Sequence, residues 1–170
     1  MITLYQATIA DIGIIRDIAE KTWFVTYRKI LSSEQMDYMF EMMYSIESIE
    51  NQIAVLNHLF FIASKNDKPL GFVSIEKQAE NLFHLHKLYI LPEGQGLGLG
   101  KTLMHKAFDF AKENSDGGNC ALELNVNRKN KALPFYLKMG MHISDEGDFD
   151  IGRGFYMNDY ILRIDLLIGS

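Results

Sequence analysis

Four glycines at alternate positions form the stretch in which chemistry is most readily recognised. Gly94, Gly96, Gly98 and Gly100 follow a β-prone segment that Pro92 closes, and residues with helical spacing come after them. Such a turn presents backbone N–H groups, unobstructed by Cβ atoms, at the positive end of a helix. A loop that is merely tight needs fewer glycines. The stretch therefore predicts a site for phosphate or pyrophosphate.

Two common phosphate-binding patterns fit this stretch poorly. The dinucleotide pattern Gly-x-Gly-x-x-Gly fails in every register, because Leu99, Lys101 and Leu103 stand where its third glycine belongs. The nucleotide P-loop pattern matches at Gly100-Lys101-Thr102, but its first glycine is replaced by Gln95. A P-loop nucleotide hydrolase that uses Lys101 and Thr102 is therefore an alternative that lacks part of its motif.

The pattern that fits is Gln95-x-x-Gly98-x-Gly100, which resembles the Gln/Arg-x-x-Gly-x-Gly/Ala motif of the GCN5-related N-acetyltransferase (GNAT) superfamily. The resemblance implies that the turn binds the pyrophosphate of acetyl-CoA and that the preceding strand holds the pantetheine arm. A non-catalytic acyl-CoA sensor would keep the same turn, so it remains an alternative of another class. The implied cofactor contacts are Leu88, Tyr89, Ile90, Gln95, Gly96, Leu97, Gly98, Leu99, Gly100, Lys101, Thr102, Asn130 and Ala132.

Two histidines could supply the base that acetyl transfer to an amine requires. An alkylammonium, with a pKa of about 10, must lose a proton before it attacks a thioester, and neutral histidine can accept that proton. His84 and His86 lie two apart on the predicted strand 82–91, so we expect them on one face and Leu85 and Lys87 on the other. By resemblance, His84 has the offset of the histone acetyltransferase glutamate, and arylalkylamine N-acetyltransferases carry His-x-His here. These matches favour His84 as the base, with His86 second.

A tyrosine could protonate the thiolate that leaves. The segment from Asn130 to Gly140 resembles the family sequence Asn-x-x-Ala…Phe-Tyr-x-Lys-x-Gly-Phe, and Tyr136 has the position of its tyrosine. A tyrosine that only packs beside Phe135 is the competing interpretation. The single cysteine, Cys120, is expected in the core, so we expect direct attack in a ternary complex and no acyl-enzyme.

The acceptor site is less clearly encoded. Trp23 and Tyr27, four residues apart on a predicted helix, could line it with aromatic faces, although core packing is the competing interpretation. Gly152-x-Gly154 and Met157-x-Asp159-Tyr160 resemble bacterial polyamine acetyltransferases of the PaiA-like spermidine/spermine group. The resemblance implies a small polyamine or arylalkylamine acceptor; a protein N-terminus or lysine is the alternative. A polycation would also be attracted to the acidic residues Glu34, Asp37, Glu41, Glu47 and Glu50.

The elements that would position these residues follow from hydrophobic spacing and turn residues. Helical spacing predicts helices over about 8–27, 32–43, 46–56, 98–115 and 130–139. β-prone segments predict strands over 2–7, 60–64, 70–76, 82–91, 121–126, 141–144 and 155–167, with a turn at 66–69 and a glycine-bearing loop at 148–154.

This order resembles the α/β (α+β) fold of the acetyltransferase family, and it covers nearly the whole chain. The resemblance implies one domain over residues 1–170, with a mixed, largely antiparallel sheet of about seven strands flanked by helices. In that fold the strand before the glycine turn and the strand after its helix splay apart, and acetyl-CoA lies in the gap.

Composition limits the partners. The 170 residues are 48% apolar and carry a net charge of −5, which argues against nucleic acid as a partner. No apolar run reaches the length of a membrane span and no signal peptide is evident, so we expect a cytoplasmic protein without a membrane partner. Cys120 has no histidines at zinc spacing, so no metal is expected. Members of the resembled superfamily often dimerise, and a homodimer is compatible with the sequence.

Overall fold

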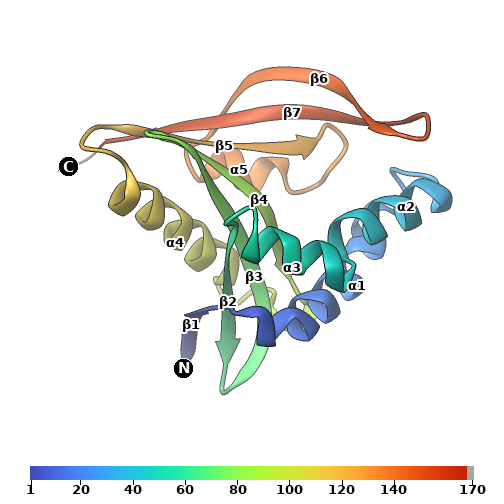
Figure 1. Cartoon of the computed structure of the whole chain (residues 1–170), viewed down its shortest axis with the longest axis horizontal. Coiled ribbons are helices and arrows are strands. Elements are labelled where there is room, and N and C mark those ends of the chain that lie inside the picture. The colour runs from blue at the N-terminus through green and yellow to red at the C-terminus, as the bar shows by residue number, and fades with distance from the viewer. Residues whose placement is uncertain (168–170) are drawn as a thin grey trace.

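One seven-stranded sheet forms the centre of the computed structural model, which describes residues 1–167 (Figure 1). Its strand order is β1-β2-β3-β4-β5-β7-β6, and β4–β5 is the one parallel pair among antiparallel neighbours. The predicted mixed, largely antiparallel sheet is thereby confirmed. The strands are β1 (Ile2–Gln6), β2 (Leu59–Lys65), β3 (Lys68–Ala79), β4 (Leu82–Ile90), β5 (Cys120–Asn127), β6 (His142–Gly152) and β7 (Phe155–Leu166).

Helices cover both faces of the sheet (Figure 1). One face is covered by α1 (Ile12–Tyr27), α2 (Ser33–Tyr44) and α3 (Ile46–Ala54), and the other by α4 (Leu99–Asn114). The short α5 (Leu133–Lys138) follows β5, and 3-10 turns occupy Ile9–Asp11 and Pro92–Gly94. Apolar residues bury on each face because their spacing gives each helix one apolar stripe. None of the helices over residues 1–167 is long and apolar enough to cross a membrane.

Side-chain caps begin the helices of the first layer. Thr8 and Asp11 form a capping box, since Asp11 Oδ2 accepts the Thr8 backbone N–H at 2.9 Å. Ser32 Oγ accepts the Gln35 N–H at 3.1 Å, but the side chain of Gln35 donates to the Tyr156 carbonyl at 2.8 Å and does not return to the Ser32 backbone. The cap of α2 is therefore one-sided, and Gln35 joins α2 to β7.

A long hairpin replaces the loop predicted over 148–154. β6 continues to Gly152, and Arg153 and Gly154 form a two-residue turn with φ values of 54° and 79°. Two positive φ values match the type I′ turn, which suits the twist of paired strands. The prediction was wrong because β6 is an edge strand without a buried residue, so it lacks the apolar alternation that identifies a strand. The hairpin end contacts α2, where Tyr38 donates to the Ile151 carbonyl at 2.7 Å.

A β-bulge in β4 changes which residues share a face. The pairs on either side of it are Leu85 with Ile75 and Lys87 with Ser74, so His86 has no partner in β3. The extra residue turns Lys87 to the face of His84 and His86, where its Nζ lies 5.6 Å from the Tyr44 and Phe60 ring centroids. The prediction that Lys87 lies on the opposite face was wrong, because strict alternation assumes a strand without bulges.

The parallel strands β4 and β5 separate halfway along their length. Their pairing runs from Leu82 with Ala121 to Leu85 with Leu124 and then stops. β4 continues to Ile90 and β5 to Asn127, so both carry unpaired backbone groups beyond that point. The predicted splayed pair is confirmed, and it opens a gap beside the glycine turn.

Candidate active site

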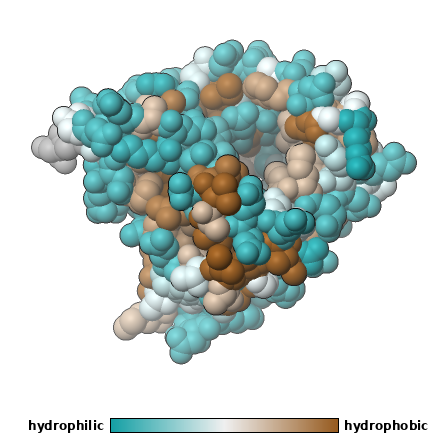
Figure 2. Space-filling view, viewed as in Figure 1, coloured by the Kyte–Doolittle hydropathy of each residue, from teal (hydrophilic) through white to brown (hydrophobic). Residues whose placement is uncertain are grey.

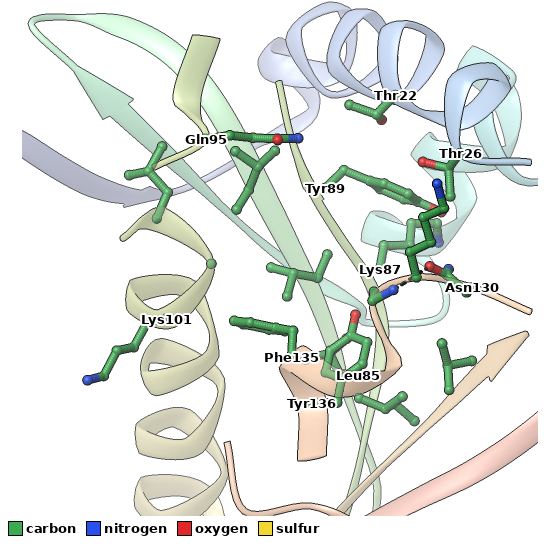
Figure 3. A pocket seen from close by; sticks show the side chains of 18 of the residues that line it. Thr22, Thr26, Leu85, Lys87, Tyr89, Gln95, Lys101, Asn130, Phe135 and Tyr136 are labelled. Atoms are coloured by element: carbon green, nitrogen blue, oxygen red, sulfur yellow. Dashed lines mark hydrogen bonds between the residues drawn. The ribbon is translucent and has the colours of Figure 1, made fainter. Parts of the chain in front are cut away.

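A cavity of about 740 Å³ occupies this gap (Figure 3). Its walls come from α1, the second half of β4, the glycine turn, β5 and the segment 130–136. Figure 3 shows Tyr89 and Lys87 of β4 near Thr22 and Thr26 of α1, with Phe135 and Tyr136 on another side. On the surface, a recess opens beneath the β6–β7 hairpin (Figure 2). The cavity volume of about 740 Å³ lies within the range of small-molecule sites.

The structure brings most of the predicted cofactor residues to this cavity. Leu97 and Thr102 are the two that do not line it: Leu97 is exposed, and Thr102 Oγ1 donates to the Gly98 carbonyl at 3.0 Å. The predicted residues that do line it are Leu88, Tyr89, Ile90, Gln95, Gly96, Gly98, Leu99, Gly100, Lys101, Asn130 and Ala132.

The glycine turn has the geometry of an anion cradle. Gly96 and Gly98 have φ values of 78° and 75°, and apart from the adjacent residues no heavy atom of residues 1–167 lies within 4 Å of where a Cβ would stand on either glycine. α4 begins at Leu99, and its first internal hydrogen bond is from Thr102 N to Gly98 O at 3.0 Å. The preceding amides therefore have no partner within the helix. Free amides, open space and the positive helix end together fit a pyrophosphate.

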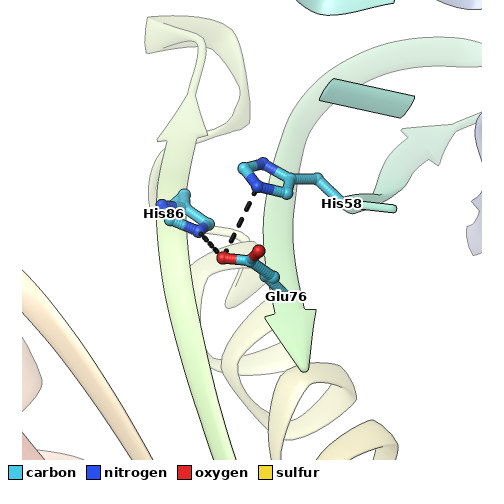
Figure 4. Close-up of side chains that lie close together, drawn as sticks. All are labelled: His58, Glu76 and His86. Atoms are coloured by element: carbon cyan, nitrogen blue, oxygen red, sulfur yellow. Dashed lines mark hydrogen bonds and ion pairs between the residues drawn. The ribbon is translucent and has the colours of Figure 1, made fainter. Parts of the chain in front are cut away.

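Three side chains from separate segments converge beside β4 (Figure 4). Glu76 Oε1 of β3 lies 2.9 Å from His86 Nε2 and 3.5 Å from His58 Nε2. The His58 and His86 rings stack with centroids 4.3 Å apart and planes 8° apart. Burial lowers the pKa of His86 to about 4, although the Glu76 carboxylate acts in the opposite direction. Burial also lowers the pKa of His58, so both imidazoles are neutral at pH 7.

The two predicted histidines have different environments. His86 lines the cavity, whereas His84 does not. The rings lie 4.6 Å apart between centroids. His84 stands opposite Glu76 on one side and Glu123 on the other, so it lies in a row of polar side chains across the sheet. Burial lowers the pKa of His84, against the attraction of Glu123 and Glu76. The geometry therefore favours His86 for direct contact with a ligand.

Lys87 is a buried cation whose side chain the bulge in β4 turns toward the cavity. It lines the cavity, its exposed fraction is 7%, and Nζ donates to Gln52 Oε1 at 2.7 Å. No salt bridge within residues 1–167 involves Lys87. Burial lowers the pKa of Lys87 to about 8, because its ammonium loses water without gaining a carboxylate.

This burial predicts an alkaline gain in stability. Between pH 8 and 10.5 the unfolded chain binds more protons at Lys87 than the folded chain does, so the free energy of unfolding rises with pH. Relative to Lys87→Met, which has no titrating group here, we expect the wild-type protein to gain on the order of 3 kcal/mol across this range. Urea unfolding of both proteins at several pH values measures the difference. A difference that is constant with pH would show that Lys87 keeps an ordinary pKa.

The aromatic residues divide between cavity and core. Tyr136 lines the cavity, and its burial raises the pKa of the phenol, which keeps it protonated. Tyr27 also lines the cavity; burial raises its pKa to about 12, and Asn130 Nδ2 lies 3.4 Å from its oxygen. Trp23 does not line the cavity: it is 1% exposed, and its Nε1 donates to the Met36 carbonyl at 3.2 Å. Core packing therefore accounts for Trp23.

A family model described as an acetyltransferase (GNAT) domain matches residues 27–153. Among curated proteins, the chain is similar to a spermidine N(1)-acetyltransferase of Thermoplasma acidophilum, with 29% identity over 88% of this chain and 93% of that protein. It is also similar to the peptidyl-lysine N-acetyltransferase YjaB of Escherichia coli, with 30% identity over 54% of each chain.

Solved structures show the same architecture. The crystal structure of PaiA N-acetyltransferase from Thermoplasma acidophilum in complex with coenzyme A has a TM-score of 0.80, with 27% identity over 96% of this chain and 98% of that one. The ribosomal-protein-S18-alanine N-acetyltransferase of Escherichia coli has a TM-score of 0.73 with 15% identity, over 100% and 97% of the two chains, and supports the fold alone.

Proposed function

Because the chain belongs to the GNAT acetyltransferase family, we propose that it transfers acetyl from acetyl-CoA to a small polyamine by direct attack in a ternary complex. The cavity is the main observation that supports this proposal. The glycine turn, the unpaired edges of β4 and β5, His86 and Tyr136 all line it. Family membership removes the P-loop nucleotide hydrolase as an alternative.

The proposed binding of acetyl-CoA uses backbone groups. The amides from Gly96 to Lys101 would hold the pyrophosphate at the start of α4, and the unpaired edge from Leu88 to Ile90 would pair with the pantetheine arm. Once bound, acetyl-CoA supplies an activated acetyl thioester. Orientation against this edge lets a bound amine approach the carbonyl carbon with little loss of freedom at the moment of reaction.

Two side chains handle the protons in this proposal. His86 accepts the proton of the acceptor amine, because its neutral ring lines the cavity and can act directly or through water. His84 does not line the cavity, so it is not placed to accept the amine proton. Tyr136 donates a proton to the departing sulfur, because burial keeps its phenol protonated and on the cavity wall. Cys120 is buried at the start of β5 and does not line the cavity, so it takes no part.

Several observations support a polyamine as the acceptor. The spermidine acetyltransferase resembles this chain over 93% of its own length, whereas the peptidyl-lysine acetyltransferase matches over about half. The net charge of −5 favours a cationic substrate. Asp159, which is 5% exposed, has an Oδ1 atom without a hydrogen-bond partner among residues 1–167, and Asn125 on the cavity wall donates to its other oxygen at 3.4 Å. A buried carboxylate beside the cavity favours a cation.

A thiol-release assay with purified protein tests the proposal. Acetyl-CoA is mixed with spermidine, spermine, arylalkylamines or lysine peptides, and free CoA is measured. We expect the polyamines to give the highest kcat/KM. A preference for a lysine peptide would identify peptidyl lysine, and not a polyamine, as the acceptor. Tight acetyl-CoA binding without CoA release in the presence of any amine would favour the non-catalytic sensor.

Replacing Tyr136 with phenylalanine tests the proposed acid. The change removes one buried hydroxyl and keeps the ring in place, so we expect little loss of stability. Turnover should fall by about 10- to 100-fold, because the sulfur would leave without a positioned proton donor. The acetyl-CoA dissociation constant should stay within about threefold. Wild-type turnover in this variant would assign the acid role to another group.

A further inference from the structure

We propose that Glu76 is a positioning residue for acetyl transfer: its carboxylate fixes the proton of His86 on Nε2, so that Nδ1 carries the lone pair that accepts the amine proton. The proposal rests on the proposed function, in which His86 is the base. No motif identified in the sequence contains Glu76, which lies on β3 ten residues before His86.

The hydrogen bond defines the tautomer. An ionised carboxylate can only accept, so a Glu76 oxygen 2.9 Å from His86 Nε2 requires that nitrogen to carry the proton. The pKa of Glu76 is lowered: burial raises it, but hydrogen bonds from His86 and Gln78 and the attraction of His58 and His86 together outweigh burial, so the carboxylate is ionised at pH 7. A neutral imidazole with its proton on Nε2 has its basic lone pair on Nδ1.

Two contacts restrict the rotation of the His86 ring. The bulge makes His86 an extra residue in β4. Its ring contacts Glu76 of β3, the residue that pairs with His84. On one side the ring stacks on His58, which is 8% exposed and lies in the connection between α3 and β2. A ring held at one edge and one face keeps the same orientation when a ligand arrives, so the lone pair is already positioned before binding.

The proton transfer balances without any further reactant. His86 Nδ1 takes a proton from the amine as the new N–C bond forms, and the C–S bond breaks as Tyr136 gives its proton to sulfur. The resulting imidazolium lies against the Glu76 carboxylate, which stabilises the positive charge at the atom where it develops. Solvent then returns the proton from His86 to Tyr136, which restores both groups.

Neighbouring charges determine how many protons the cluster can hold. The titratable groups facing His86 are Glu76 from β3, His84 and Lys87 from β4, and His58 from the residue before β2. Glu76 is the one carboxylate in contact with His86 among residues 1–167, whereas Lys87 and the other imidazoles oppose a positive charge. Removing the Glu76 charge should therefore affect the protonated state of His86 more than its neutral state.

The same three donors could also bind a metal ion, since their ligand atoms all lie within 4.8 Å of one another. Two features oppose that use. A metal ion lies in the plane of each imidazole that binds it, but the stacked rings are nearly parallel, so one of them would have to turn. The buried ammonium of Lys87 also repels a divalent cation here. Metal binding is therefore the less favoured use of these donors, and the test below includes it as an outcome.

Nitrogen-15 NMR of the histidine side chains tests the tautomer directly, without substrates. In the wild-type protein at pH 7 we expect His86 to show a protonated Nε2 and an unprotonated Nδ1. Glu76→Gln keeps a carbonyl acceptor and should retain much of this state, whereas Glu76→Ala should mix the two tautomers. A wild-type His86 protonated on Nδ1, or a one-to-one Zn²⁺ complex that forms at micromolar Zn²⁺ and shifts both ring nitrogens, would overturn the proposal.

Kinetics supply the second readout. We expect kcat to fall about tenfold in Glu76→Gln and about 100-fold in Glu76→Ala, with KM for the amine and the acetyl-CoA dissociation constant within about threefold. Glu123→Gln is the matched control, because Glu123 flanks His84 from the other side and does not contact His86; its kcat should stay within about threefold. Equal losses in Glu76→Ala and Glu123→Gln, or none in Glu76→Ala, would contradict the positioning role.

The two proposals can fail separately. If the wild-type protein releases no CoA with any amine, the proposed function fails whatever the tautomer. If the wild-type protein is active and His86 shows the expected tautomer, but Glu76→Ala keeps full kcat, the function stands and the role of Glu76 fails. Thermal unfolding of each variant separates these results from a loss of fold.

Discussion

Replacing His86 with glutamine is expected to lower kcat by about 100-fold or more, because a positioned general base typically contributes that much. Glutamine keeps a polar side chain of similar reach but cannot take a proton from an amine. The acetyl-CoA dissociation constant should change by less than about threefold, since the cofactor site proposed here uses backbone groups of β4 and the glycine turn. Turnover by thiol release and binding by calorimetry measure the two quantities separately.

His84→Gln is the matched comparison for this variant. His84 lies on the same strand but does not line the cavity, so we expect its kcat to fall by less than about tenfold. A large loss of kcat in His84→Gln, with wild-type kcat in His86→Gln, would identify His84 as the general base, which is the assignment that sequence resemblance favours.

The pH profile provides a further check on His86. Its pKa of about 4 keeps the ring neutral above pH 6, so protonation of His86 should not limit kcat/KM between pH 6 and 9. The rise of kcat/KM over this range should instead follow the pKa of the acceptor amine, and it should shift when acceptors of different basicity are compared. A profile with a fixed midpoint near 6.5 for every acceptor would show that an ordinary histidine limits the rate.

Replacing Gly98 with valine is expected to weaken acetyl-CoA binding by about 30-fold or more. Gly98 has a φ of 75°, which costs a β-branched residue about 1–3 kcal/mol. Its missing Cβ faces open space within the turn where we place the pyrophosphate, so valine would also block that anion. Calorimetry with acetyl-CoA measures the loss.

Gly117→Val separates strain from blockage. Gly117 has nearly the same φ, 79°, and its Cβ would likewise meet no described heavy atom within 4 Å beyond the adjacent residues, but it follows α4 and does not line the cavity. Both variants should lose similar stability, and only Gly98→Val should lose acetyl-CoA affinity. Equal affinity in the two variants would argue against a pyrophosphate at the turn.

Sequence patterns predicted the helices and strands in which apolar residues recur at a regular spacing. The turn at Asn66 and Asp67, the helix beginning after Gly98 and the strands around them are all confirmed, because apolar spacing and turn residues agree there. β6 was missed because an exposed edge strand has no buried face to leave an apolar pattern. Its two-residue turn at Arg153 and Gly154 was read as part of a longer loop.

Local sequence patterns could not predict that His58, Glu76 and His86 form a cluster. His58 and Glu76 lie 28 and 10 residues before His86 and join it only through strand register. The bulge at His86 also reverses the face of Lys87, and nothing in the local sequence marks that extra residue. The glycine turn, in contrast, was recognisable because the residues proposed to hold the pyrophosphate form one contiguous motif.

A crystal structure of the protein with acetyl-CoA tests the central claim most directly. We expect the pyrophosphate against the backbone amides between Gly96 and Lys101, the pantetheine arm along the unpaired edge of β4, and the acetyl group near His86 and Tyr136. Density for the ligand at another surface, with the gap between β4 and β5 holding only solvent, would contradict it.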